Sequence, residues 1–133
     1  MFTGTLKFNL DIDNSYTDDR IIALLNEAGL EDLIKRDEKG IYMDIVENGG
    51  NLSSGEKQLI CICRAILRKN KVIILDEATA NIDVVSEEKI QRLIGLEFTD
   101  ATVITIAHRL NTIISSDRVL VLSFGEVKEY DSP

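Results

Sequence analysis

The sequence predicts an α/β fold in which helices pack on a partly parallel sheet. Two short apolar segments, residues 72–75 and 102–107, have the length and the β-branched content of strands that are buried on both faces. Residues 84–94, between them, have apolar side chains at helical spacing. Strand, helix and strand in this order indicate two parallel neighbours joined by a crossover, the unit from which α/β layers are built.

Helices are also predicted before the first strand. Residues 18–28 carry an apolar stripe, with Thr17 or Asp18 as the N-cap and Gly29 placed to end the helix. The chain before Gly49 and Gly50 is therefore expected to be mostly helical, and the chain after them α/β. The remaining predicted elements are a short helix at 31–36, an amphipathic to buried helix at 54–68, a short helix at 110–114, and a hairpin of strands at 118–122 and 127–130.

Composition narrows the class of protein. The 133 residues are 44% apolar and carry a formal charge of −8, which suits one soluble globular unit and argues against a nucleic-acid partner, since such a surface needs clustered Lys and Arg. The two cysteines, Cys61 and Cys63, and the single histidine cannot form a set with the spacing of zinc ligands. Both cysteines are therefore predicted to be core residues of a reduced, cytosolic chain. No apolar run approaches the ~18 residues that suggest a membrane span.

The stretch GGNLSSGEKQ, residues 49–58, fits two interpretations, a phosphate-binding loop and the start of a helix. Gly50 and Gly55 have the separation found in a phosphate-binding loop, but Glu56 stands where that loop needs its lysine. Ser53 with Glu56 three residues later instead predicts a capping box, in which each side chain accepts a hydrogen bond from the other residue's backbone at a helix start. Free amides at a helix N-terminus also bind anions, so a helix start here is compatible with a phosphate site.

Acidic residues follow the first predicted strand. Asp76 and Glu77 stand where the carboxyl ends of parallel strands present ligands, and such acids can bind Mg²⁺ or activate a water. The only histidine, His108, follows the second predicted strand. If the two strands are neighbours, His108 and Glu77 lie at the same edge of the sheet and can form one site.

Four motifs in order resemble those of the ATP-binding cassette (ABC) family. LSSGE at 52–56 is similar to the family's signature motif, VIILDE at 72–77 to its Walker B strand with the following glutamate, ANID at 80–83 to its D-loop, and His108 to its switch histidine. The flanks at 1–11, 51–83 and 105–133 resemble the second nucleotide-binding domain of the C family, the multidrug-resistance-associated type of exporter. Glu56 replaces the more usual glutamine.

The resemblance implies a partial P-loop NTPase-like ABC ATPase core, with a parallel sheet and helices, plus part of the α-helical subdomain. Residues 1–52 would belong to the helical subdomain, and residues 53–133 to the signature helix and the C-terminal part of the core. No Walker A lysine is recognised, and the chain begins just after the place of the family's Q-loop glutamine. The sequence is therefore expected to be about the C-terminal half of a cassette.

The resemblance also implies roles for individual residues. The nucleotide would be bound, head to tail with a second nucleotide-binding domain, by residues of the signature motif and the D-loop: Leu52, Ser53, Ser54, Gly55, Glu56 and Asp83. Asp76 would help to hold Mg²⁺, and Glu77 and His108 would be catalytic. ATP hydrolysis would power transport through transmembrane domains of the parent protein, with this segment on the cytosolic face of the membrane.

Two alternatives remain beside this ATPase module. The chain could be a non-catalytic truncated cassette that only pairs with another nucleotide-binding domain. A cassette of the chromosome-maintenance ATPase type would carry long heptad repeats around its motifs, and the sequence shows none.

Overall fold

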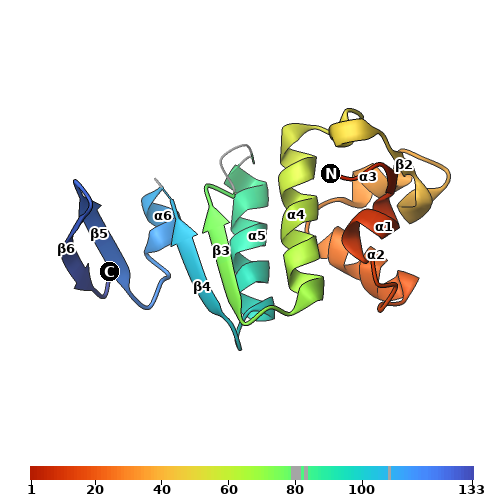
Figure 1. Ribbon diagram of the computed structural model, residues 1–133. Coiled ribbons are helices and arrows are strands. Elements are labelled where there is room, and N and C mark those ends of the chain that lie inside the picture. Colours follow the sequence, from red (N-terminus) through yellow and green to blue (C-terminus); the bar gives the residue numbers. More distant parts are fainter. Residues whose placement is uncertain (79–81, 83, 108) are drawn as a thin grey trace.

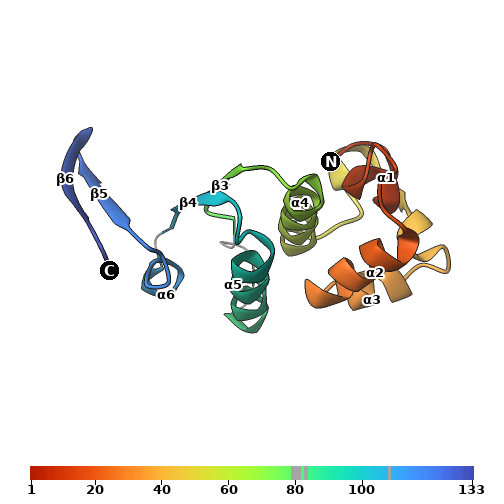
Figure 2. The same cartoon turned by 90° about the horizontal axis from the view of Figure 1, so that it is seen from below.

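The computed structural model describes residues 1–78, 82, 84–107 and 109–133. Figure 1 shows the elements following one another across the molecule, from the helices of the N-terminal part, through α4 (Ser54–Arg68) and α5 (Val84–Glu97), to the strands of the C-terminal part. The N-terminal helices and the C-terminal end of the chain thus lie at opposite ends of the molecule, as they also do after rotation in Figure 2.

Short helices make up most of the chain before Gly49 and Gly50, as predicted. They are α1 (Leu6–Leu10), α2 (Asp18–Glu27), α3 (Glu31–Lys35) and the 3₁₀ helices η1 (Gly40–Tyr42) and η2 (Glu47–Gly49). Two strands that were not predicted, β1 (Gly4–Thr5) and β2 (Asp44–Ile45), form an antiparallel pair. This pair brings the start of the chain beside the segment that leads to α4.

The boundaries of α2 follow from its caps. The Thr17 hydroxyl accepts a hydrogen bond from the backbone N–H of Arg20 at 3.4 Å, and Asp18 and Asp19 fill the first turn, where carboxylates interact well with the helix dipole. Gly29 adopts a φ of +78° directly after the C-cap, a conformation that glycine reaches without strain. Both predicted helix ends are therefore confirmed.

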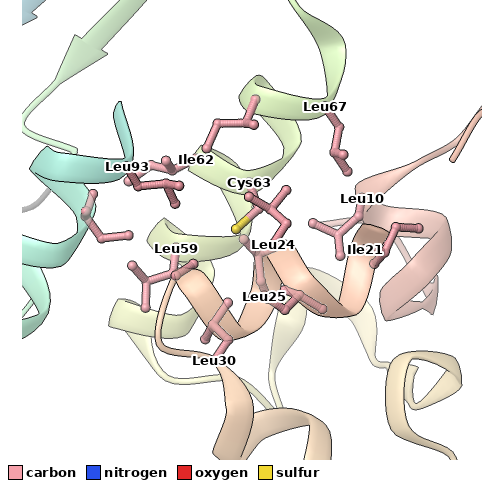
Figure 3. Close-up of a cluster of buried hydrophobic side chains, with 14 of the residues drawn as sticks. Leu10, Ile21, Leu24, Leu25, Leu30, Leu59, Ile62, Cys63, Leu67 and Leu93 are labelled. Carbon is pink, nitrogen blue, oxygen red and sulfur yellow. The ribbon is translucent and has the colours of Figure 1, made fainter. Parts of the chain in front are cut away.

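The largest helix, α4, packs between the N-terminal helices and α5. Figure 3 shows its side chains Leu59, Ile62 and Cys63 within one apolar cluster, with Leu24 of α2 on one side and Leu93 of α5 on the other. Leu24 and Cys63 are fully buried. Removal of this apolar surface from water stabilises the arrangement of the three helices.

A parallel pair of strands carries the acids of interest. β3 (Val72–Asp76) and β4 (Thr102–Ile106) pair residue for residue, from Val72 opposite Thr102 to Asp76 opposite Ile106, and α5 connects them. The predicted neighbouring of these two strands is confirmed.

The prediction that these strands are buried on both faces is wrong. In β3 only Ile73 and Leu75 are buried, whereas Val72 and Ile74 are 57% and 65% exposed, and Ile104 on the neighbouring strand is 49% exposed. A continuous apolar run is typical of a strand with side chains packed on both of its faces. Here the described side chains cover only the face toward the helices. The bare face is thus an exposed apolar surface.

The chain ends in the predicted hairpin. β5 (Val119–Ser123) and β6 (Glu126–Asp131) pair antiparallel, with Gly125 in the turn at a φ of +80°, after the short helix α6 (Leu110–Ile113). Among the described residues, none of the helices combines the length and the hydropathy that crossing a bilayer requires.

The two cysteines differ in environment. Cys63 is buried, as predicted, but Cys61 is exposed, so its assignment to the core was wrong. The difference follows from the helix, since residues two apart in α4 point about 200° apart. Burial raises the pKa of the Cys63 thiol to about 12.

Thiol alkylation is expected to separate the two cysteines. At about pH 8 an accessible thiol supplies enough thiolate to react, because the pKa of free cysteine is about 8.5. Iodoacetamide should therefore modify one thiol in the folded chain and two in urea. Mass spectrometry of peptides should place the first label on Cys61, and a Cys61→Ser variant should stay unlabelled until it is unfolded. Equal labelling rates for the two native thiols would contradict the burial of Cys63.

Candidate functional site

The loop before α4 ends in the predicted capping box. The Ser53 hydroxyl accepts from the backbone N–H of Glu56 at 3.2 Å, and the Ser53 backbone N–H donates to Glu56 Oε2 at 2.7 Å. The predicted capping box is confirmed. The serine is exposed, so its hydroxyl lies at a solvent-accessible helix end, where the helix dipole and free amides favour an anion.

The other residues of the predicted signature motif lie in the same turn. Leu52 is buried and belongs to the apolar core, whereas Ser54 is exposed and Gly55 is partly exposed. The Leu52 side chain thus packs in the core and holds the loop in place, whereas Ser53, Ser54 and Gly55 lie at the surface.

Residues outside the motif hold this loop in place. The Asn51 side chain donates from Nδ2 to the carbonyl oxygen of Asp44 at 2.8 Å, and its Oδ1 accepts from the N–H of Val46 at 3.2 Å. Arg36, at the end of α3, lies with Nη1 3.3 Å from Glu56 Oε1 and donates from Nη2 to the Asn51 carbonyl oxygen at 3.4 Å. Sequence reasoning missed the Arg36 contact, because a long segment separates α3 from the motif.

The two acids at the end of β3 are both exposed. Asp76 is the last residue of the strand, and Glu77 has a φ of +47°, in the left-handed region that residues with a side chain seldom adopt. The Glu77 backbone N–H donates to the carbonyl oxygen of Ile106 at 3.0 Å, which ties this strained residue to the end of β4. Strain of this kind is found at functional sites when the surroundings enforce it.

A buried acid on α5 holds the segment that follows β4. Glu87 is only 9% exposed; it forms an ion pair with Arg109 and accepts from the Thr112 hydroxyl at 3.3 Å. These contacts fix the start of α6 against α5. Sequence reasoning missed the cluster, since an acid and a base 22 positions apart carry no spacing pattern.

The structure thus brings some of the predicted site residues together and leaves others aside. Ser53 to Glu56 form one group at the start of α4, and Asp76 and Glu77 form a second at the end of β3. Figure 1 shows the start of α4 and the end of β3 toward the same upper side of the molecule. His108 and Asp83 lie outside the described residues.

Two cavities lie away from both groups. A cavity of about 410 Å³ lies between α6 and the hairpin, and another of about 350 Å³ lies between α2 and α5. Neither is lined by a predicted site residue. Ser53, Asp76 and Glu77 are all exposed.

Comparison with known proteins identifies the family. The family described as "ABC transporter" matches residues 3–80, which include the start of α4 and the end of β3. This chain belongs to the ABC transporter family.

Relatives confirm the predicted resemblance to the C branch of the ABC family. The whole chain is 48% identical to "ATP-binding cassette sub-family C member 4" of Homo sapiens, of which it covers 10%, and 45% identical to sub-family C member 2 of Rattus norvegicus, of which it covers 9%. The chain therefore spans about a tenth of the length of these relatives.

A solved structure confirms the predicted fold. A bacterial Atm1-family ABC exporter with ATP bound superposes with a TM-score of 0.87 at 32% identity, over 99% of this chain and 23% of that one. The mixture of helices and a parallel strand pair is thus part of an ABC ATPase core.

Proposed function

We propose that this chain is the distal half of an ATP-hydrolysing cassette in a C-family exporter, and that it resembles the second cassette of such proteins. Residues 1–52 form part of the helical subdomain, and residues 53–133 form the signature helix and the later part of the ATPase core. The observation that carries the proposal is the position of Asp76 and Glu77 at the carboxyl end of β3, the strand of a parallel pair.

The start of α4 is proposed to bind a phosphate in trans. Ser53, Ser54 and Gly55 offer hydroxyl and amide donors at the N-terminus of a helix, where a phosphate group gains from the dipole. The nucleotide itself is held by a second nucleotide-binding domain, which pairs head to tail with this one. Leu52 and Glu56 keep the loop in shape, and Asp83 contacts the partner domain.

The end of β3 is proposed to act on the nucleotide of its own cassette. The exposed Asp76 carboxylate fits Mg²⁺, which proteins bind through one or two carboxylates together with phosphate oxygens. Glu77 orients the attacking water and accepts its proton, and His108 contacts the terminal phosphate and stabilises its developing charge. Transmembrane domains of the parent protein couple this reaction to transport, with the cassette on the cytosolic face.

A second candidate function is that the chain pairs with another cassette without catalysis. The bare face of β3 and β4 favours this alternative for the chain by itself, because Val72, Ile74 and Ile104 offer an apolar surface for association. The two functions differ in whether ATP turnover depends on Glu77.

Nucleotide binding by the 133-residue chain is expected to be weak. Titration of about 50 µM chain with MgATP in a calorimeter should show no saturation, because the described groups supply a phosphate contact in trans and one carboxylate for the metal. The intact parent should bind and hydrolyse MgATP. Saturable binding by the chain alone with a micromolar dissociation constant would contradict the proposed division of the site between domains.

A further inference from the structure

Glu56 places a negative charge in the first turn of α4, within the segment that the proposed function assigns to a phosphate. A carboxylate in the first turn suits the helix dipole, but it also repels an incoming anion at the same helix end. The structure engages both of its oxygens. Oε2 accepts from the Ser53 N–H at 2.7 Å, and Oε1 lies 3.3 Å from Nη1 of Arg36.

Arg36 is placed to act on both ends of this loop. Its second terminal nitrogen, Nη2, donates to the Asn51 carbonyl oxygen at 3.4 Å, two residues before Ser53. The planar guanidinium thus spans from the residue before the motif to the last residue of the motif. The Glu56 side chain is 19% exposed, so its pairing with Arg36 is less screened than that of a fully exposed pair.

The other cation of this turn extends elsewhere. Lys57 Cε lies 3.0 Å from the point where a Cβ on Gly49 would stand, so its side chain runs along the glycine before the loop. Among the described residues, Arg36 is the cation within ion-pair distance of Glu56.

We propose that Arg36 is a positioning residue that offsets the charge of Glu56 and so keeps the start of α4 able to accept a phosphate from another domain. The inference rests on the proposed function, because it assumes that Ser53 to Gly55 contact a phosphate. Loss of Arg36 leaves an uncompensated carboxylate beside that phosphate. Removal of both charges, by Arg36→Gln together with Glu56→Gln, makes this part of the loop neutral again, and glutamine retains the capping box.

The alternative is that Arg36 serves only to anchor the loop through the Asn51 carbonyl. The two roles predict different results for the double variant. If the charge matters, Arg36→Gln weakens nucleotide binding, and the double variant, which removes both charges, returns to the wild-type value. If only the anchor matters, the double variant stays as weak as Arg36→Gln, because nothing replaces the lost contact to the Asn51 carbonyl oxygen.

The test uses the intact cassette protein that contains this sequence, with Arg36→Gln, Glu56→Gln and both together. An unpaired carboxylate beside a bound phosphate, partly screened by solvent, changes binding about five- to tenfold. Arg36→Gln should therefore raise the KM for MgATP, and the Kd measured by equilibrium dialysis, about five- to tenfold with kcat little changed. By the same argument Glu56→Gln should lower KM and Kd about five- to tenfold, and the double variant should bring both back to within about twofold of the wild type.

A salt series supplies a second readout. The difference between Arg36→Gln and wild type should shrink as the salt concentration rises from about 50 mM to about 500 mM, since the Debye length falls below the separation of the charges. A double variant that binds MgATP as weakly as Arg36→Gln, or an effect of Arg36→Gln that does not change with salt, overturns the inference. If Arg36→Gln fails to fold, Glu56→Gln alone decides, since a KM that is unchanged or raised contradicts the charge argument.

Ser53→Ala separates failure of the inference from failure of the proposed function. If this variant leaves KM and Kd unchanged, the start of α4 does not bind the phosphate, and both proposals fall. If Ser53→Ala raises KM while Arg36→Gln does not, the proposed function stands and only the role of Arg36 is wrong.

Discussion

Glu77→Gln is expected to lower ATP turnover by the intact parent at least about a hundredfold, as loss of a general base does. Glutamine keeps the length of the side chain and the backbone at φ +47°, so the geometry at the end of β3 is retained while the proton acceptor is lost. The KM for MgATP should change little, because the phosphate contacts come from other residues. Steady-state phosphate release measures both quantities.

Glu88→Gln is the matched control for this variant. Glu88 is an exposed acid on α5, with the same charge and the same substitution but no place in the proposed reaction. It should retain turnover within about twofold, as surface substitutions away from a site do. Near-normal turnover of Glu77→Gln would remove Glu77 from the mechanism and favour the pairing function.

Leu24→Ala is expected to reduce the free energy of unfolding by about 2–5 kcal/mol, the range for truncating a fully buried leucine. Leu24 is 0% exposed and lies in the cluster of Figure 3, close to Cys63 of α4, so its removal leaves a cavity where α2 packs on α4. Such a loss is a large part of the ~5–15 kcal/mol that a domain has in total. Urea unfolding followed by circular dichroism measures it.

Leu96→Ala provides the comparison for the core variant. Leu96 is 68% exposed on α5, so the same truncation removes little packed surface and should change the unfolding free energy by less than about 0.5 kcal/mol. Similar losses for the two variants would show that the cluster around Leu24 is less well packed than the structure has it.

Local signals in the sequence predicted the elements best. The Ser53–Glu56 capping box and the glycine at position 29 are signals from residues close to one another in the chain. The helix α4 begins at the capping box, and the helix α2 ends just before Gly29. Four ordered motifs were enough to predict the family. The parallel pairing of β3 and β4 followed from a strand, helix and strand order that needs no distant information.

Contacts between distant segments escaped prediction. The approach of Arg36 to Glu56 depends on how α3 packs beside the loop, and the Glu87 cluster depends on how α6 packs on α5. The exposure of Ile74 was not predicted for a related reason. The apolar residues of a strand show that it can be buried, but the neighbouring elements decide whether it is buried. The roles of the site residues in binding and hydrolysis stay predictions.

The left-handed backbone at Glu77 sets folding and catalysis against each other at one position. A glycine there would relieve strain of about 1 kcal/mol and at the same time delete the proposed proton acceptor. A population of variants selected for thermal resistance alone would therefore drift away from glutamate at this position. One selected for ATP turnover would keep it and tolerate the weaker fold, so the two pressures should act in opposite directions at residue 77.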